Sequence, residues 1–329
     1  MSRGMERDGR PIRIGLIGTG KHGSRYANHL VRDIKGAQLT AICRRDRARG
    51  EAQAGDWGCR WFGDWRALVE DPEVDCVIAA TPPAHNGEIG AACARAGKPL
   101  LMEKPLAVSV REAEALVEHF DRAGVGLTVG QTLRYNPVIR LLREQLPTIA
   151  PLCGLTANQR LEPATLAWLD VPELAGAGVT LHTAIHVFDA VRWITGQEIV
   201  RVAARIRCVQ SRCLEDQLVA LFELGNGVLG SLECSKTGHA RSGRFELTGE
   251  GGQLWGDQVH HVCERVRQME RTVLDPGKRV YALVPLLRDW LAFLRGKGEN
   301  PVPAGDGLAA VRVCSACLRS AAKDRWEAV

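Results

Sequence analysis

The chain has 329 residues, of which 45% are hydrophobic and 25% are charged, and this is the ordinary balance of a globular protein with about two domains. The formal net charge of +5 is small and dispersed, and no nucleic-acid-binding motif is present, so we expect no nucleic-acid partner. The first ten residues are polar, and no apolar run approaches the ~18–20 residues that cross a bilayer, so we expect a cytoplasmic protein with no membrane partner.

Short β-type runs alternate with helical patterns over the first part of the chain. We expect strands at residues 12–17, 39–43, 74–80, 99–102 and 125–129, and helices at residues 22–34, 65–70, 85–96 and 110–123. Gly97 and Gly124 follow the last two helices as stop signals. Strands and helices alternating at this spacing indicate βαβ units around a parallel sheet.

The pattern changes after Pro137. We expect helices at residues 138–145, 179–194, 283–294 and 308–322, and strands at residues 200–209, 217–223, 228–234 and 244–248. The sequence Gly225-Asn226-Gly227 predicts a tight hairpin turn, so the sheet of this part is expected to be largely antiparallel and open on one face. The fold class is therefore α/β: a Rossmann domain at 1–128, then an α+β substrate-binding and oligomerisation domain at 129–329, with the C-terminal helix packing back toward the first domain.

The eleven cysteines are an odd number, and most lie in apolar strand or helix patterns, as Cys76, Cys93 and Cys234 do. This is typical of reduced, buried thiols rather than of a disulfide framework. Cys314 and Cys317 form a C-x-x-C pair in a helical stretch, and no second pair accompanies them. We expect two buried thiols on one helix face rather than a metal or redox site.

The run Gly18-Thr19-Gly20-Lys21-His22-Gly23 matches G-x-G-x-x-G between the first strand and the first helix. In this context Gly18 permits the tight turn, Gly20 lets the backbone approach a pyrophosphate, and Gly23 lets the helix pack closely. The helix N-terminus offers N–H groups and partial positive charge to phosphates. The pattern predicts a dinucleotide site, and the alternative is a glycine-rich turn that binds nothing.

The end of the second strand indicates which dinucleotide binds. An NAD site places an acid there for the ribose hydroxyls, but this chain has Arg44 and Arg45. A guanidinium can pair with a 2′-phosphate, so we expect NADP(H) in preference to NAD(H). The alternative is that the two arginines are solvated and Asp46 serves as the acid.

Two further constellations contain acid–base groups. Glu103-Lys104-Pro105 follows a strand at the edge where such sheets bind ligands, with Pro105 as a candidate cis residue, although a solvated surface pair has the same sequence. His182, His186 and Asp189 stand at i, i+4 and i+7, so one helix face is expected to present all three. Histidine can move a proton at neutral pH, whereas a metal site lacks the HExxH glutamate, and satisfied core histidines are the other reading. We expect no metal.

These motifs, in this order and spacing, resemble the Gfo/Idh/MocA oxidoreductase family almost from end to end. Besides the glycine-rich turn, the resemblance rests on Ala80-Thr81-Pro82-Pro83 with His85, Glu103-Lys104-Pro105, Gly130-Gln131 with Arg134-Tyr135-Asn136-Pro137, Trp168, the histidine helix, Glu215-Asp216, Arg319-Ser320 and Trp326.

The resemblance implies an NAD(P)-dependent oxidoreductase that acts on a hydroxyl or ketone of a sugar, cyclitol or related compound. It implies Lys104, His186 and His182 as catalytic residues, and these further contacts: cofactor at Gly18, Thr19, Gly20, Lys21, His22, Gly23, Arg44, Arg45, Thr81, Pro82, His85, Glu103 and Lys104, and substrate at Gln131, Arg134, Trp168, His182 and Asp189. Family members often have aspartate where this chain has His182, which alters the charge around the proton-transfer groups. A homodimer or homotetramer is expected through the open sheet face.

Two alternatives stay open. One is a reductase of a non-sugar carbonyl or imine, and the other is a non-catalytic regulator that binds a dinucleotide with the same fold. Lys104 and His186 favour an enzyme, because a regulator needs neither, while His182 at the usual acid position favours the regulator.

Overall fold

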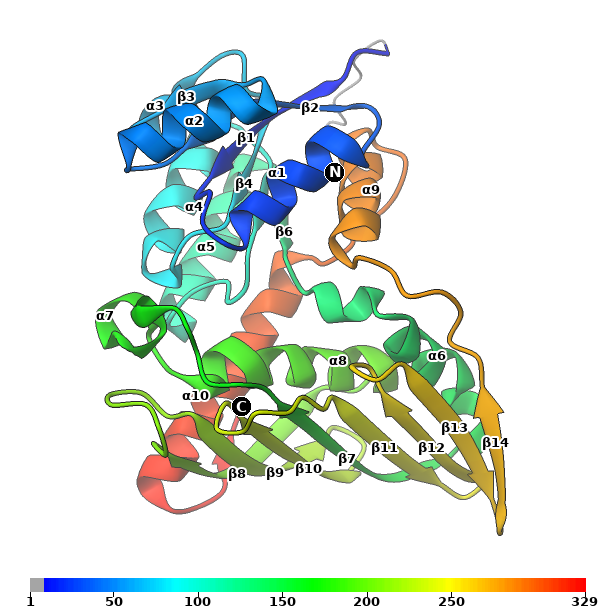
Figure 1. The fold of residues 1–329 in the computed structure, drawn as a ribbon. Coiled ribbons are helices and arrows are strands. Elements are labelled where there is room, and N and C mark those ends of the chain that lie inside the picture. Colours follow the sequence, from blue (N-terminus) through cyan, green and yellow to red (C-terminus); the bar gives the residue numbers. More distant parts are fainter. Residues whose placement is uncertain (1–8) are drawn as a thin grey trace. The chain divides into compact units, whose positions relative to one another are not determined.

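The computed structural model of the protein describes residues 9–329, which form two units (Figure 1). The first unit contains residues 9–131 together with Tyr281–Leu308, and the second contains Thr132–Val280 together with Ala309–Val329. Each unit is thus built from two separate stretches of chain. The expected assignment of separate functions to residues 1–128 and 129–329 stays a prediction.

A parallel sheet of six strands forms the centre of the first unit. Its order is β3-β2-β1-β4-β5-β6, and all neighbouring pairs are parallel. In this doubly wound order, ligands bind at the carboxyl ends of the strands where the order reverses, between β1 and β4. The strands are β1 (Ile12–Ile17), β2 (Ala37–Cys43), β3 (Arg60–Phe62), β4 (Cys76–Ala79), β5 (Leu100–Met102) and β6 (Leu127–Val129).

The helices of this unit follow the expected alternation. Gly97 and Gly124 take left-handed φ values of +65° and +62° after their helices, which confirms them as helix stops. The helices are α1 (Gly23–Arg32), α2 (Arg47–Trp57), α3 (Trp65–Glu70), α4 (Asn86–Arg95) after the 3₁₀ turn Pro83–His85, α5 (Val110–Ala123) and α9 (Leu283–Leu294).

Helix α9 and the chain after it complete the first unit, although they come from far along the sequence. A Cβ on Gly126, beside β6, would lie 2.5 Å from the ring of Phe293 of α9, so the two surfaces fit closely. Arg295 donates from Nη2 to the carbonyl oxygen of Gly36 at 2.6 Å, and the amide of Val129 donates to the carbonyl oxygen of Val302 at 3.0 Å.

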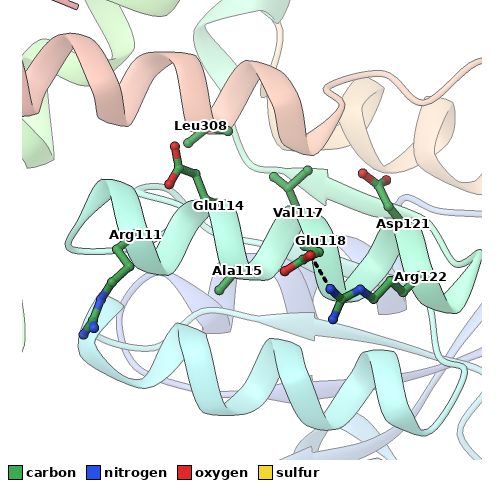
Figure 2. A pocket seen from close by; sticks show the side chains of 8 residues that line it. All are labelled: Arg111, Glu114, Ala115, Val117, Glu118, Asp121, Arg122 and Leu308. Carbon is green, nitrogen blue, oxygen red and sulfur yellow. Dashed lines mark hydrogen bonds and ion pairs between the residues drawn. The ribbon is translucent and has the colours of Figure 1, made fainter.

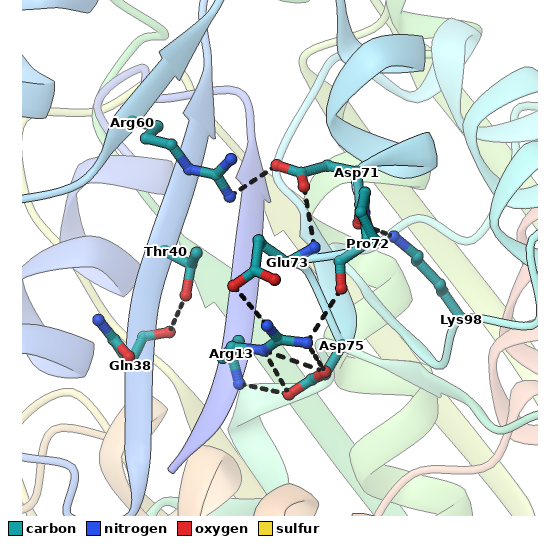
Figure 3. Close-up of polar contacts among 9 residues, drawn as sticks. All are labelled: Arg13, Gln38, Thr40, Arg60, Asp71, Pro72, Glu73, Asp75 and Lys98. Carbon is teal, nitrogen blue, oxygen red and sulfur yellow. Dashed lines mark hydrogen bonds and ion pairs between the residues drawn. The ribbon is translucent and has the colours of Figure 1, made fainter.

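An ion-pair network stabilises the amino-terminal edge of the parallel sheet (Figure 3). Arg13 of β1 donates to Asp75, just before β4, from its backbone N–H at 3.0 Å and from Nη2 at 2.9 Å, and its Nη1 lies 2.6 Å from Glu73. The Asp75 side chain is only 1% exposed, whereas that of Glu73 is 60% exposed. The buried pair therefore fixes the loop before β4, at the edge away from the expected ligand site.

Replacing Asp75 tests this network. Asp75→Asn should lower the free energy of unfolding by about 1–3 kcal/mol, because the partly exposed Arg13 loses the buried carboxylate that accepts from its guanidinium. Glu73→Gln is the matched control and should stay within ~1 kcal/mol, because exposed pairs contribute little. Urea unfolding followed by circular dichroism measures both, and equal effects would contradict the assignment.

A mixed sheet of nine strands forms the second unit, in the order β14-β13-β12-β11-β7-β10-β9-β8-β15. Only the pair β7 and β10 is parallel, so the expected, largely antiparallel sheet is confirmed. The expected turn at Gly225-Asn226-Gly227 joins two antiparallel strands, with Gly227 at φ +85°. The strands are β7 (Leu152–Arg160), β8 (Ile199–Arg207), β9 (Gln217–Leu224), β10 (Leu229–Ser235), β11 (Arg244–Gly249), β12 (Gly252–Asp257), β13 (Val262–Arg267), β14 (Glu270–Leu274) and β15 (Glu327–Ala328).

Helices cover one face of this sheet, as Figure 1 shows for α6 and α8. Phe188 of α8 meets Phe222 of β9 edge to face, with ring centroids 6.2 Å apart, and both side chains are fully buried. On the other face Val219 and Leu221 of β9 are 47% and 52% exposed. The helices of this unit are α6 (Pro137–Gln145), α7 (Pro172–Ala175), a π-helical turn at Thr180–Ala184, α8 (Ile185–Thr195) and most of α10 (Ala304–Lys323), whose residues up to Leu308 belong to the first unit.

Three expectations need correction. The helix expected at 179–194 is not α-helical throughout, because its first turn is the π-helical turn Thr180–Ala184. The segment Pro172–Thr195 is long and apolar enough to span a bilayer, against the expectation that no run is, but 83% of its most apolar window is buried in the fold, as in the core helix of a soluble protein. The helix expected from residue 308 begins at Ala304.

The cysteines are distributed largely as expected within the described part of the chain. No disulfide links any of them there, and seven of the eleven are buried, including both members of the C-x-x-C pair. Burial raises the pKa of Cys317 to about 12, so its thiol stays protonated and unreactive near neutral pH. Cys314 donates instead to the carbonyl oxygen of Thr180 at 3.2 Å. The pair therefore belongs to the core of the second unit.

Candidate functional site

The glycine-rich turn connects β1 to α1, with His22 as the residue before the helix. Gly18 has a φ of +86°, a region that other residues rarely adopt. A Cβ on Gly23 would lie 1.8 Å from the carbonyl oxygen of Gly18, so only glycine lets α1 start here. A Cβ on Gly20 would meet nothing within 4 Å. The turn therefore leaves open space beside the backbone at Gly20, next to a helix N-terminus, which is the kind of position where phosphates bind.

Arg44, at the end of β2, lies against this turn. Its Nη1 donates to the carbonyl oxygen of Thr19 at 2.7 Å, and the Thr19 hydroxyl donates to Oε1 of Gln53 at 2.6 Å. Arg45 is exposed beside it. Asp46 accepts a hydrogen bond from the amide of Arg49 at 3.1 Å and so caps α2, which engages the carboxylate considered as the alternative ribose ligand.

The turn after β4 contains the expected residues Thr81, Pro82 and His85, all partly exposed. The Thr81 hydroxyl donates to Oδ1 of Asn86 at 3.2 Å, and Nδ2 of Asn86 donates to the carbonyl oxygen of Pro105 at 2.9 Å. Asn86 is buried and was not among the expected site residues. It ties the turn after β4 to the turn after β5, so the two neighbouring turns hold one geometry.

Glu103 and Lys104 form the turn after β5. Oε1 of Glu103 accepts from the hydroxyl of Tyr26 at 2.5 Å and contacts Nε2 of His22 at 2.8 Å, and Oε2 accepts from the amide of Lys104 at 3.2 Å. Burial acts to raise the pKa of Glu103, but the His22 charge and the hydrogen bonds outweigh it and lower that pKa below its ordinary value. The Lys104–Pro105 peptide is cis, as expected. Lys104 is partly exposed, and Lys21 is exposed on the glycine-rich turn.

In the second unit, Glu215 caps the helix that contains the histidines. Its Oε1 accepts from the amides of Gly178 at 2.9 Å and Thr180 at 3.1 Å, and its carbonyl oxygen accepts from the amide of Val179 at 2.7 Å. A Cβ on Gly178 would lie 1.9 Å from that carbonyl oxygen. Glu215 thus accepts hydrogen bonds from the backbone N–H groups that have no helical partner where the π-helical turn begins. Such π-helical turns are frequent at functional sites.

The loop that contains Glu215 is held by two other carboxylates. Asp170 accepts from the amides of residues 212–214, and Asp216 accepts from the amides of residues 209–211. Backbone hydrogen bonds, that of Leu214 first, lower the pKa of Asp170. Asp170 also ends the 3₁₀ turn that contains Trp168, so this turn and the capping loop are connected.

The structure divides the three polar residues of the helix among different surroundings. Nε2 of His182 lies 3.0 Å from the carbonyl oxygen of Ala175, and its ring meets Trp168 edge to face at 5.5 Å. Asp189 is fully buried. His186 is the one residue from 180 to 192 that is not buried. The three residues are therefore not presented together as expected: His182 and Asp189 are buried in the protein interior, and only His186 is partly exposed.

Arg134 and Asp189, both expected to contact substrate, bind each other. Nε of Arg134 lies 2.8 Å from Oδ2 of Asp189, and Nη2 lies 2.5 Å from Oδ1. Both side chains are almost inaccessible, at 8% and 0% exposed, so this is a buried bidentate ion pair between the 3₁₀ turn Thr132–Tyr135 and α8. Gln131, in the first unit, is fully buried. Contact of these residues with substrate stays a prediction.

A hollow of about 670 Å³ lies elsewhere in the first unit, along α5 (Figure 2). Charged side chains of α5 line it, among them Glu118 and Arg122, which pair with each other, and Leu308 completes the lining. None of the expected cofactor, catalytic or substrate residues borders it. The turns after β1, β2, β4 and β5 therefore remain the candidate functional site.

The parallel order β3-β2-β1-β4-β5-β6 and the glycine-rich turn define the first unit as a dinucleotide-binding Rossmann domain. Residues 12–131 match the family model described as oxidoreductase family, NAD-binding Rossmann fold, and residues 154–255 match the GFO/IDH/MocA C-terminal domain. The chain belongs to the Gfo/Idh/MocA family of oxidoreductases, which confirms the resemblance found in the sequence.

Curated relatives match three quarters or more of the chain. Inositol 2-dehydrogenase 4 of Saccharopolyspora erythraea is 31% identical over 93% of this chain and 92% of its own. A relative from Bacillus subtilis named scyllo-inositol 2-dehydrogenase (NAD(+)) is 28% identical over 76% of this chain and 75% of its own. Among solved structures, an oxidoreductase domain protein from Kribbella flavida has a TM-score of 0.88 at 25% identity, covering 97% of this chain and 99% of that one.

Proposed function

We propose that the protein is an NAD(P)-dependent oxidoreductase that interconverts a CH–OH group and a carbonyl on a sugar, cyclitol or related hydroxy/keto compound. The observation that carries the proposal is the glycine-rich turn, where Gly23 is required for the helix start and open space beside Gly20 leaves room for a diphosphate. Membership of the family and the dehydrogenase names of the relatives support the reaction class.

Lys104 and His186 are the residues that we propose handle the substrate's proton and charge. When bound, the nicotinamide supplies the hydride acceptor or donor. The positive charge of the Lys104 ammonium group stabilises the alkoxide that develops on the substrate oxygen. His186 gives a proton to that oxygen or takes one from it. The partial exposure of both side chains supports these roles, because a group that meets substrate must be reachable.

We propose different roles for the other expected substrate residues. Trp168 offers its ring to the apolar face of a polyhydroxylated substrate, while His182, held by Ala175 and Trp168, completes the polar surroundings of the proton transfer. Arg134 and Asp189 position α8 through their buried ion pair. Gln131 remains a proposed substrate contact, and Thr81, Pro82 and His85 remain proposed cofactor contacts.

We propose NADP(H) as the preferred cofactor, on the support of Arg44 and Arg45 at the end of β2 and of the commitment of Asp46 to capping α2. Arg45→Ala should weaken NADPH binding about 10-fold or more and leave NADH binding unchanged, because ~1.5–3 kcal/mol of charge-assisted hydrogen bonding to a 2′-phosphate is lost. Arg47→Ala is the matched control, because Arg47 is a neighbouring arginine paired with Glu51 at 2.8 Å. Fluorescence titration of the unaltered protein and both variants with each nucleotide measures these affinities, and tighter binding of NADH by the unaltered protein would overturn the preference.

The function itself is tested by titrating the protein with NADH and NADPH and then screening inositols, sugars and keto-sugars for absorbance change at the nicotinamide band. Turnover on a polyol supports the proposal. Binding without turnover across the panel would favour the regulator, and turnover only on non-sugar carbonyls or imines would favour the other reductase class. Failure to bind either nucleotide would remove the proposal.

We also propose a cytoplasmic location and self-association into a dimer or tetramer through the open sheet face. Exposed apolar side chains on the sheet support the second point: Val219, Leu221, Leu229, Val262 and Val273. Light scattering coupled to gel filtration tests it, and a monomer at micromolar concentration would contradict it.

A further inference from the structure

Glu103 connects the two turns that the proposed function assigns to cofactor and to chemistry. One oxygen of its carboxylate holds Tyr26, inside the first helix after the glycine-rich turn, and His22, in the turn itself. The other oxygen accepts from the backbone amide of Lys104 at 3.2 Å. All four residues belong to the first unit, so the connection lies within a single folded body.

The surroundings of this carboxylate are closely fitted. Glu103 is 7% exposed and Tyr26 is 0% exposed, so the hydrogen bond between them is shielded from solvent, whereas the His22 side chain is 45% exposed. A Cβ on Gly130, just after β6, would lie 2.9 Å from Oε1 and 3.1 Å from Cδ of Glu103, so the carboxylate fills the space that glycine leaves. Three donors, from helix α1, the glycine-rich turn and the turn after β5, together with the close approach of Gly130, hold the carboxylate in one orientation.

A buried carboxylate is a costly way to stabilise a fold, because an apolar side chain of similar size avoids the desolvation penalty. An acceptor-only group is required, however, where three N–H or O–H donors converge. Here the donors are the His22 side chain of the proposed phosphate-binding turn, the Tyr26 hydroxyl of the helix that follows it, and the backbone amide of the proposed catalytic Lys104. The Glu103 carboxylate therefore fixes the two turns relative to each other.

We propose that Glu103 is a positioning residue that sets the position of Lys104 against the glycine-rich turn, through His22 and Tyr26. The inference rests on the proposed function, since Lys104 is given its role there. Glu103 touches neither reacting atom in this proposal, and it acts on the rate only through the lysine.

Glu103→Gln is the direct test. A glutamine amide has one acceptor oxygen, so if that oxygen faces Tyr26 and His22, its NH₂ group points at the donating amide of Lys104. The turn must then shift, and a misplacement of about 1 Å costs roughly 10- to 100-fold in kcat. The KM for the polyol and the dissociation constant of NADPH should change by less than about 10-fold, since the binding surfaces keep their side chains.

Two comparisons separate positioning from a general structural role. Asp75→Asn makes the same chemical change on a buried carboxylate at the opposite edge of the same sheet, and should lower thermal stability without changing kcat. In a Lys104→Ala background, Glu103→Gln should change the residual turnover by less than about twofold, because residues that act as a unit are not additive. If Glu103→Gln lowered the turnover by the same factor in the Lys104→Ala background as in the unaltered protein, the inference would be wrong.

Milder variants keep the test decisive if Glu103→Gln folds poorly. Tyr26→Phe removes one hydrogen-bond donor and keeps the ring. Gly130→Ala places a methyl group against the Glu103 carboxylate. Both variants should lower kcat. If the unaltered protein turns over a polyol and the variants have the same kcat, this inference is wrong but the proposed function stands. An unaltered protein that binds no dinucleotide would overturn the proposed function and the inference with it.

Discussion

Replacing Lys104 or His186 by alanine is expected to lower the turnover number by about 10²–10⁴, the range typical of general acid–base groups. Without Lys104 the developing alkoxide loses its counter-charge, and without His186 the substrate proton loses its donor or acceptor. Stopped-flow absorbance at the nicotinamide band, in a single turnover with saturating cofactor, isolates this step from product release.

His119→Ala is the control for the histidine, because His119 is exposed on α5. Lys98→Met is the control for the lysine, because Lys98 donates to the carbonyl oxygen of Asp71 at the other edge of the sheet. Both controls should turn over normally. If either alanine variant kept the full single-turnover rate, that residue would have no part in the chemistry.

Alanine at Gly20 and at Gly23 is expected to abolish most dinucleotide affinity for different reasons. The new methyl at Gly20 meets no protein atom, so the fold should persist while the methyl occupies the space proposed for the pyrophosphate, which displaces at least one charge-assisted hydrogen bond and costs about 10- to 100-fold in affinity. The new methyl at Gly23 collides with the carbonyl oxygen of Gly18, so stability and affinity should both fall.

Gly55→Ala serves as the comparison, because Gly55 lies within α2 with nothing within 4 Å of its would-be Cβ. It should leave affinity unchanged and raise helix stability by up to ~1 kcal/mol. Calorimetric titration with NADPH and thermal unfolding measure the three variants together. Normal affinity in Gly20→Ala would show that the turn does not hold a diphosphate.

Elements with a clear apolar period were predicted closely from the sequence, and the others were not. The strand Ile12–Ile17 and the helix Val110–Ala123 have their expected bounds. Helix α2 was not predicted, because Gly50 and Ala54 are its buried residues and the rest of its surface is polar. Strand β7 contains Gly, Asn and Gln, and its parallel partner β10 follows some seventy residues later, so its pairing leaves no local signal.

The residues of the candidate site also divide into those that the sequence predicted and those that it did not. The glycine-rich turn and the Glu-Lys-Pro turn were found because their chemistry is contained in consecutive residues. Tyr26, Gln53 and Asn86 were missed, because their partners lie on other turns and only the folded chain brings them together. Tyr26 left one signal, a hydroxyl at an inward position of its helix, but its acceptor, Glu103, is 77 residues away.

Helix α9 has a consequence for how the protein is made. Phe293, Arg295 and Val302 complete the surface of the sheet beside β6 and below Gly36, yet they leave the ribosome after nearly the whole chain has been synthesised. Amino-terminal domains usually fold first during translation. The first unit is complete only when residues up to 308 have been synthesised, so we expect a chain that stops near residue 131 to leave exposed the surface around Gly126 that Phe293 of α9 covers.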